Sequence, residues 1–160
     1  MHGKSSMLYL DNAATTPLLP EVRKVMINYM VDNFGNPSSI YKIGRMNKIA
    51  VEEARKSIAK TIGACPDDIF FTSGGTESDN WVLESAAESA TESDSAHIIV
   101  SAIEHPAVIN KCIQLKKRGC DVDYIKTDKN GIINTDDLIS KIRDDTKLIS
   151  VMLVNNEIGT

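Results

Sequence analysis

The sequence predicts an α/β fold, organised as a three-layer sandwich around a mainly parallel sheet. Short apolar segments with strand character alternate with amphipathic segments of helical period from residue 69 to residue 154. Parallel strands need crossover connections, and these connections place helices on both faces of the sheet. The composition of 42% hydrophobic and 25% charged residues is typical of a chain that buries a core.

The first part of the chain is predicted to contain two helices. A short strand is expected at residues 8–10, a helix at residues 20–32 and a longer amphipathic helix at residues 44–62, which Gly63 ends. Polar, turn-rich loops are predicted at residues 11–17 and 33–39, the second of which contains Gly35. The apolar stripe of the second helix is expected to lie in a core and consists of Ile49, Ala50, Ala54, Ile58 and Ile62.

The second part is predicted to alternate regularly between strands and helices. Strands are expected at residues 69–72, 97–101, 122–125 and 148–154, and helices at residues 76–87, 106–118 and 135–143. Residues 1–6 are interpreted as a leader, and residues 89–95 as a surface connector. Ligands of such sheets bind beyond the carboxyl ends of the strands. Three polar clusters are predicted at that edge, at residues 73–76, 104–106 and 155–157.

The cluster at residues 73–76 reads Ser-Gly-Gly-Thr and stands between a predicted strand and a predicted helix. Two residues without side chains allow backbone N–H groups at a helix start to approach a phosphate, which the helix dipole also favours. The alternative is an ordinary turn in which Thr76 or Ser78 caps the helix, and the bare motif favours that alternative. Neither the dinucleotide nor the P-loop glycine pattern is present.

Charge and cysteine content exclude several classes of function. The net charge of −4, with both signs interspersed, argues against nucleic-acid binding, which needs clustered Lys and Arg. No apolar run has the length of a membrane span and no signal peptide is evident, so a cytoplasmic location is expected. Cys65, Cys112 and Cys120 are odd in number and lack Cys-x-x-Cys spacing, which predicts neither disulfides nor a metal site. All three are expected to pack rather than react.

Five motifs in register along residues 8–160 resemble the cysteine desulfurases, which belong to the fold-type I pyridoxal-phosphate enzymes. The motifs are residues 9–17 (Tyr-Leu-Asp-Asn-Ala-Ala-Thr-Thr-Pro), 34–39 (Phe-Gly-Asn-Pro-Ser-Ser), 71–80 (Phe-Thr-Ser-Gly-Gly-Thr-Glu-Ser-Asp-Asn), Glu104-His105 and 154–159 (Val-Asn-Asn-Glu-Ile-Gly). Selenocysteine lyases share much of this pattern. The fold expected from the resemblance is part of the large domain of a fold-type I enzyme.

The resemblance implies a role for individual residues. Gly75 and Thr76 are expected to contact the phosphate of pyridoxal 5'-phosphate, and Asn156 to bind its ring hydroxyl. His105 is expected to stack on the pyridine ring and to help move protons, which makes it the catalytic candidate. Asn12, Ala13 and Asn36 are expected near the substrate.

The resemblance also implies a reaction and partners. In the family, sulfur is removed from L-cysteine to give L-alanine and an enzyme persulfide, which passes sulfur to acceptor or scaffold proteins for iron–sulfur cluster or thio-cofactor assembly. Such enzymes are expected to be homo-oligomers.

The family's Schiff-base lysine, ring-nitrogen aspartate, substrate arginine and persulfide cysteine have no counterpart in this sequence. We therefore expect residues 1–20 to form an N-terminal arm, and residues 21–160 to form the N-terminal part of the cofactor-binding domain. The segment alone is expected to be inactive. Two alternatives are a selenocysteine lyase or other fold-type I enzyme, and a non-catalytic dimerisation or interaction module.

Overall fold

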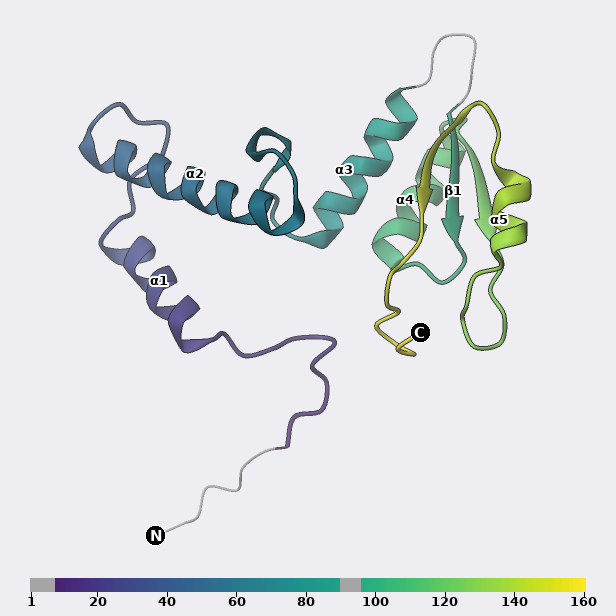
Figure 1. The fold of residues 1–160 in the computed structure, drawn as a ribbon, viewed down its shortest axis with the longest axis horizontal. Helices are drawn as coiled ribbons and strands as arrows, with labels where there is room; N and C mark the ends of the chain where they lie inside the picture. Colours follow the sequence, from purple (N-terminus) through teal and green to yellow (C-terminus); the bar gives the residue numbers. More distant parts are fainter. Residues whose placement is uncertain (1–7, 90–95) are drawn as a thin grey trace. The chain divides into compact units, whose positions relative to one another are not determined.

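The computed structural model describes residues 8–89 and 96–160. These residues divide after Phe71 into two compact units, a helical unit before this point and a sheet unit from Thr72 onward (Figure 1). The predictions for residues 1–6, and for nearly all of the connector at 89–95, lie outside the described residues.

The helical unit contains α1 (Pro20–Val31), α2 (Lys42–Ile62) and a short 3₁₀ turn, η1 (Pro66–Asp68). Helix α1 begins with proline in its first turn, where the missing N–H would have no helical partner. Helix α2 ends at Gly63, whose φ of 70° lies in the left-handed region that glycine adopts without strain. Both helices start and stop within two residues of their predicted bounds.

Two predicted strands of the helical unit do not form. Residues 8–10 are exposed, and neither they nor residues 69–72 pair with a strand among the described residues. The backbone at Ile69 is extended, with φ −99° and ψ 122°, but α2 holds this segment instead of a sheet. Arg55 donates to the Ile69 carbonyl, and its guanidinium lies 5.0 Å from the centroid of the Phe71 ring. Extended residues become a strand only when a neighbour supplies the ladder.

The prediction that the apolar stripe of α2 lies in a core is wrong for the described structure. Only Gly44, Asn47 and Ala59 are buried on this helix, whereas Ile49 and Ile62 are 58% and 66% exposed. Helix α1 has no buried residue and adds no second apolar layer to the unit. A helix stripe is buried only where another element packs against it.

The sheet unit has three parallel strands in the order β2-β1-β3. Its elements are α3 (Gly75–Glu88), β1 (His97–Ser101), α4 (Pro106–Lys117), β2 (Asp121–Ile125), α5 (Thr135–Lys141) and β3 (Thr146–Ser150). The predicted α/β class with a parallel sheet is confirmed. Strand β3 was predicted at residues 148–154, but it starts and ends earlier because its pairing with β1 stops at Val100 and Ser150.

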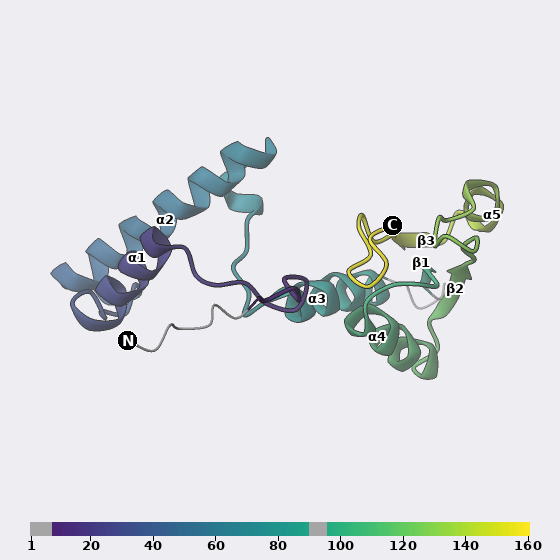
Figure 2. The same ribbon diagram turned by 90° about the horizontal axis from the view of Figure 1, so that it is seen from below.

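The core of the sheet unit lies between the sheet and two helices. Helices α3 and α4 cover one face of the sheet, and α5 lies on the opposite side (Figure 2). All five residues of β1 are buried because this strand is central. The core cluster consists of Leu83, Ile98, Val100, Val108, Cys112, Leu115 and Val122. Within the described ranges, no helix combines the length and apolarity needed to cross a bilayer.

The three cysteines differ in their surroundings. Cys112 is fully buried in the core cluster, and Cys120 packs half-buried against it, as predicted. Cys65 is exposed, so the expectation that it packs is wrong; it stands between the end of α2 and η1. Burial raises the pKa of the Cys112 thiol to about 11, and the negative charge of Glu104 contributes to the shift.

We expect alkylating reagents to separate these thiols. In the native chain at about pH 8, Cys65 reacts first because it is exposed, while Cys112 stays protected because only the thiolate is nucleophilic. Peptide mass mapping after a timed pulse of iodoacetamide measures the order of reaction. In concentrated urea all three cysteines react at similar rates. Native Cys112 labelling as fast as that of Cys65 contradicts the assignment.

Candidate functional site

Two segments at the carboxyl edge of the sheet are hydrogen-bonded to each other. Residues 102–105 follow β1, and residues 151–160 follow β3. The Oε1 atom of Glu104 accepts hydrogen bonds from Ser101 Oγ and from the Met152 backbone N–H, both at 2.6 Å. Asn155 Nδ2 donates to the Ile103 carbonyl at 3.0 Å. The loop after β1 is therefore held against the loop after β3 at two points.

Asn155 also shapes its own loop. Its side chain is 8% exposed, and Oδ1 accepts from the backbone N–H groups of Glu157 and Ile158 at 2.9 and 3.1 Å. Its carbonyl accepts from Gly159, whose φ of 71° is left-handed. The turn leaves the next residue, Asn156, exposed. The buried side chain of Asn155 thus holds the turn that exposes Asn156.

A cavity of about 280 Å³ lies between these loops. It is lined by residues 103–106 and 155–158, so it brings the predicted residues His105 and Asn156 to one place. The predicted residues Gly75 and Thr76 do not line it. Gly75 and Thr76 are connected to the cavity through hydrogen bonds between the starts of α3 and α4.

His105 is the N-cap of α4, and its ring is oriented by the helix. Its Nδ1 atom accepts a hydrogen bond from the Ala107 backbone N–H at 3.1 Å. Because Nδ1 is an acceptor, the proton of the neutral imidazole is on Nε2. The residue is exposed.

The first turn of α3 has the features of an anion site. Its N-cap is Gly74, and no side chain caps it, so the alternative in which Thr76 or Ser78 caps the helix is wrong. A Cβ atom added at Gly75 would meet nothing within 4 Å, and Gly75 has no positive φ. Glycine is therefore required here neither by packing nor by backbone conformation, and its effect is to leave the N–H groups of the turn accessible.

Glu77 organises the segment before that turn. Its Oε2 accepts from the backbone N–H and the Oγ of Ser73, at 2.6 and 2.7 Å. These two hydrogen bonds lower the pKa of the Glu77 carboxyl, so it stays ionised. The carboxylate therefore ties Ser73 to the first turn of α3.

Asn80 connects the starts of α3 and α4. Its Nδ2 atom donates to the Thr76 carbonyl at 2.7 Å and to the Ala107 carbonyl at 3.3 Å. Ala107 is the residue whose N–H caps against His105. The structure therefore places Thr76 and His105 on two helix starts that share one amide. Asn80 closes the motif at residues 71–80, but no role for it was predicted from the sequence.

The other predicted site residues belong to the helical unit. Asn12 and Ala13 lie in a turn closed by the Ala14 N–H and the Asp11 carbonyl at 3.2 Å. Asn36 accepts from the Ser38 N–H at 2.8 Å. Their proximity to a substrate stays a prediction. The buried Asn47, which donates to two carbonyls of the loop at residues 33–39, was not identified from the sequence.

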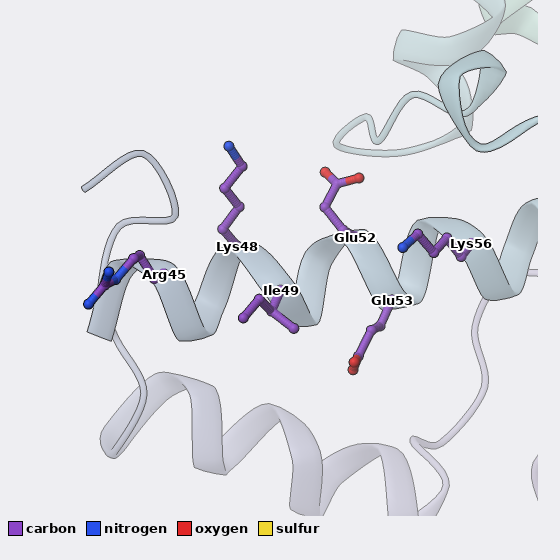
Figure 3. Close-up of a pocket in the computed structure, with 6 residues that line it drawn as sticks. All are labelled: Arg45, Lys48, Ile49, Glu52, Glu53 and Lys56. Carbon is purple, nitrogen blue, oxygen red and sulfur yellow. The ribbon is translucent and has the colours of Figure 1, made fainter. Parts of the chain in front are cut away.

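A further hollow lies in the helical unit and holds none of the predicted site residues. The hollow drawn in Figure 3 is lined only by residues of α2, and Lys48 and Glu52 point away from Ile49 and Glu53. Within residues 8–89 and 96–160, no group of three or more His, Cys, Asp or Glu side chains is arranged to hold a metal ion. The edge formed by residues 73–76, 103–106 and 155–158 is the candidate site.

Comparison with known proteins identifies the family. Residues 8–160 match the aminotransferase class-V family, which is nearly the whole chain. The chain belongs to this family. A protein of Methanosarcina thermophila named cysteine desulfurase IscS is 50% identical over 157 residues, which are 98% of this chain and 39% of that protein. A protein of the same name from Dictyoglomus turgidum is 50% identical over 153 residues.

Solved structures show the same relationship. A NifS-like protein has a TM-score of 0.89 at 39% identity, over 94% of this chain and 41% of its own. SspA in complex with cysteine also has a TM-score of 0.89, at 38% identity, over 95% of this chain and 44% of its own. The chain therefore spans about two fifths of the length of these relatives.

We expect replacement of Asn80 to loosen the starts of α3 and α4. Asn80→Ala removes two hydrogen bonds and costs about 1 kcal/mol of unfolding free energy. Asn80→Asp costs more at neutral pH, because a carboxylate then faces two carbonyl oxygens. That repulsion raises the pKa of the new carboxyl in the folded state, so the extra loss is present above that pKa and disappears as the pH falls through it.

Hydrogen exchange of the α3 and α4 amides measures this effect. The matched control is Asn110→Asp, at an exposed position on α4, which is expected to change little. Equal protection in Asn80→Asp and in the unsubstituted chain at neutral pH contradicts the role assigned to the amide.

Proposed function

We propose that the chain is the N-terminal part of a pyridoxal-phosphate-dependent cysteine desulfurase. The observation that carries this proposal is the hydrogen-bonded junction at the sheet edge, which joins the starts of α3 and α4 to the loop of Asn156. The relatives named cysteine desulfurase support the choice of activity. The chain spans 39% of those proteins, so the activity is that of a longer polypeptide.

The residues at this edge fit the proposed cofactor. The uncapped start of α3 offers N–H groups to a phosphate at Gly75 and Thr76, and open space there lets the phosphate approach. His105 offers an exposed imidazole to the pyridine ring, and Asn156 an exposed amide to the ring hydroxyl. When bound, pyridoxal phosphate supplies an electron sink for bond cleavage in the amino-acid substrate.

His105 is the residue proposed to exchange protons. Its Nδ1 is engaged by the Ala107 N–H, so Nε2 is the atom that gives or takes a proton. The same hydrogen bond fixes the plane of the ring, which a stacking contact requires. Asn156 orients rather than reacts, because an amide has no proton to exchange at neutral pH.

The substrate and partners follow from the proposed activity. The substrate is L-cysteine; SspA, a structural neighbour, was solved in complex with cysteine. Sulfur is passed to acceptor or scaffold proteins for iron–sulfur cluster or thio-cofactor assembly in the cytoplasm, and the enzyme is a homo-oligomer. Residues 1–20 act as an arm that brings Asn12 and Ala13 near the substrate. Asn36 lies near the substrate as well. Residues 21–160 form part of the cofactor-binding domain.

The experiment compares the 160-residue chain with a longer protein that contains this chain and has the length of its relatives. This longer protein is called the full-length protein. Both are purified, incubated with pyridoxal phosphate and L-cysteine under a thiol reductant, and assayed for sulfide and alanine. We expect equal amounts of alanine and sulfide from the full-length protein, and none above free cofactor from the 160-residue chain. A full-length protein that binds the cofactor but releases no alanine from cysteine overturns the proposal.

We expect Gly75→Val to weaken cofactor binding without unfolding the chain. A branched side chain at the first position of α3 occupies the space that the phosphate needs, while no neighbour lies within 4 Å of the new Cβ. In the full-length protein, the dissociation constant for pyridoxal phosphate is expected to rise at least about tenfold, which is roughly 1.4 kcal/mol. The free energy of unfolding is expected to change by less than about 1 kcal/mol.

Equilibrium dialysis and urea denaturation give the two quantities. The matched control is Ser85→Val, which places the same side chain at an exposed position farther along α3. Cofactor affinity lost equally in both variants would show that the effect comes from the helix and not from the phosphate position.

A further inference from the structure

We propose that Glu104 is a positioning residue that sets the separation between His105 and Asn156. It does so by joining the ends of β1 and β3 through one carboxylate oxygen. The readouts in the loaded enzyme rest on the proposed function, whereas the geometry stands on the structure of this chain.

Glu104 continues the connection between the strands beyond the point where the sheet ends. The last residues paired between β1 and β3 are Val100 and Ser150. Beyond them, Glu104 Oε1 accepts from Ser101 Oγ on one strand end and from the Met152 N–H after the other, each at 2.6 Å. Hydrogen bonds to a charged acceptor are among the stronger ones in proteins. The carboxylate therefore holds the two chain segments together where backbone pairing has stopped.

The position of Glu104 couples this link to the site. It immediately precedes His105, the N-cap of α4, and it lies three residues after Ser101, where β1 ends. Met152, its partner on the other segment, precedes the turn built by Asn155, which presents Asn156. A shift of Met152 relative to Glu104 consequently changes the distance between the two exposed side chains.

Asn155 forms a second link in parallel, through its bond to the Ile103 carbonyl. Because this link and the core cluster remain when Glu104 is replaced, the variant is expected to fold with a displaced edge. Glu104 is half-buried and lines the same cavity as the exposed His105, but its Oε1 is engaged by Ser101 and Met152, so this carboxylate oxygen supports the loops. Replacement of Glu104 is expected to change the positions of His105 and Asn156 more than it changes the free energy of unfolding.

The decisive comparison is between Glu104→Gln and Glu104→Ala. Glutamine retains an oxygen that accepts both hydrogen bonds but loses the charge, whereas alanine loses both. The matched control is Asp144→Ala, which removes an exposed carboxylate from the same unit away from this edge. If Glu104 acts by position, glutamine rescues; if it acts by charge or proton transfer, glutamine fails as alanine does.

In the full-length protein with pyridoxal phosphate, Glu104→Ala is expected to lower kcat about 10- to 100-fold with little change in KM, as displaced catalytic groups do. Its bound-cofactor absorption spectrum is expected to shift, because ring contacts change. Glu104→Gln and Asp144→Ala are expected to stay within about twofold of the unsubstituted protein, which is less than 0.5 kcal/mol. Loss of kcat in Glu104→Gln equal to that in Glu104→Ala overturns the proposal.

A measurement without cofactor separates this proposal from the proposed function. In the isotope-labelled 160-residue chain, Glu104→Ala is expected to move the NMR signals of the His105 ring and the Asn156 amide, and Glu104→Gln to leave them near their original positions. Unmoved signals in Glu104→Ala overturn the positioning role even if the enzyme is a desulfurase. Moved signals with no desulfurase activity refute the proposed function and leave the positioning role supported.

Discussion

The structure of the sheet unit depends on the parallel pairing of β1 with strands on both sides. Every residue of β1 is buried, because β2 and β3 pair with its two edges and α3 packs against it. Since parallel strands end at the same edge, this pairing fixes where the chain leaves the sheet after Ser101 and after Ser150. The loops of His105 and Asn156 inherit their proximity from that constraint.

The fold of the sheet unit was largely predictable because its signals are local. Helix α4 has proline at its start and basic residues at its end, and β1 is a short apolar run, so both bounds follow from nearby residues. The segments at residues 8–10 and 69–72 have strand composition as well, yet neither pairs within the described chain. Likewise the stripe of α2 is amphipathic but mostly exposed. Whether an apolar segment is buried depends on a partner that its own residues do not encode.

The candidate site was predictable in its exposed residues and not in its supports. The resemblance singled out Gly75, His105 and Asn156, and the structure places the last two on one cavity. It gave no role to Asn80, Glu104 or Asn155, although each makes hydrogen bonds to two or more partners. Asn and Glu are common surface residues, and only coordinates show that these side chains join segments far apart in sequence. The sequence did offer one signal for these supporting residues: each is a polar residue that lies inside a motif but has no ligand role of its own.

The separation between exposed and supporting residues determines which positions at this edge tolerate substitution. Asn80, Glu104 and Asn155 bind backbone groups or a strand-end hydroxyl, so their partners persist when neighbouring side chains change. His105 and Asn156 are exposed residues outside that framework. Replacing either side chain leaves the hydrogen bonds of Asn80, Glu104 and Asn155 intact. The outer side chains can thus be exchanged while the inner three still join the two loops and the two helix starts.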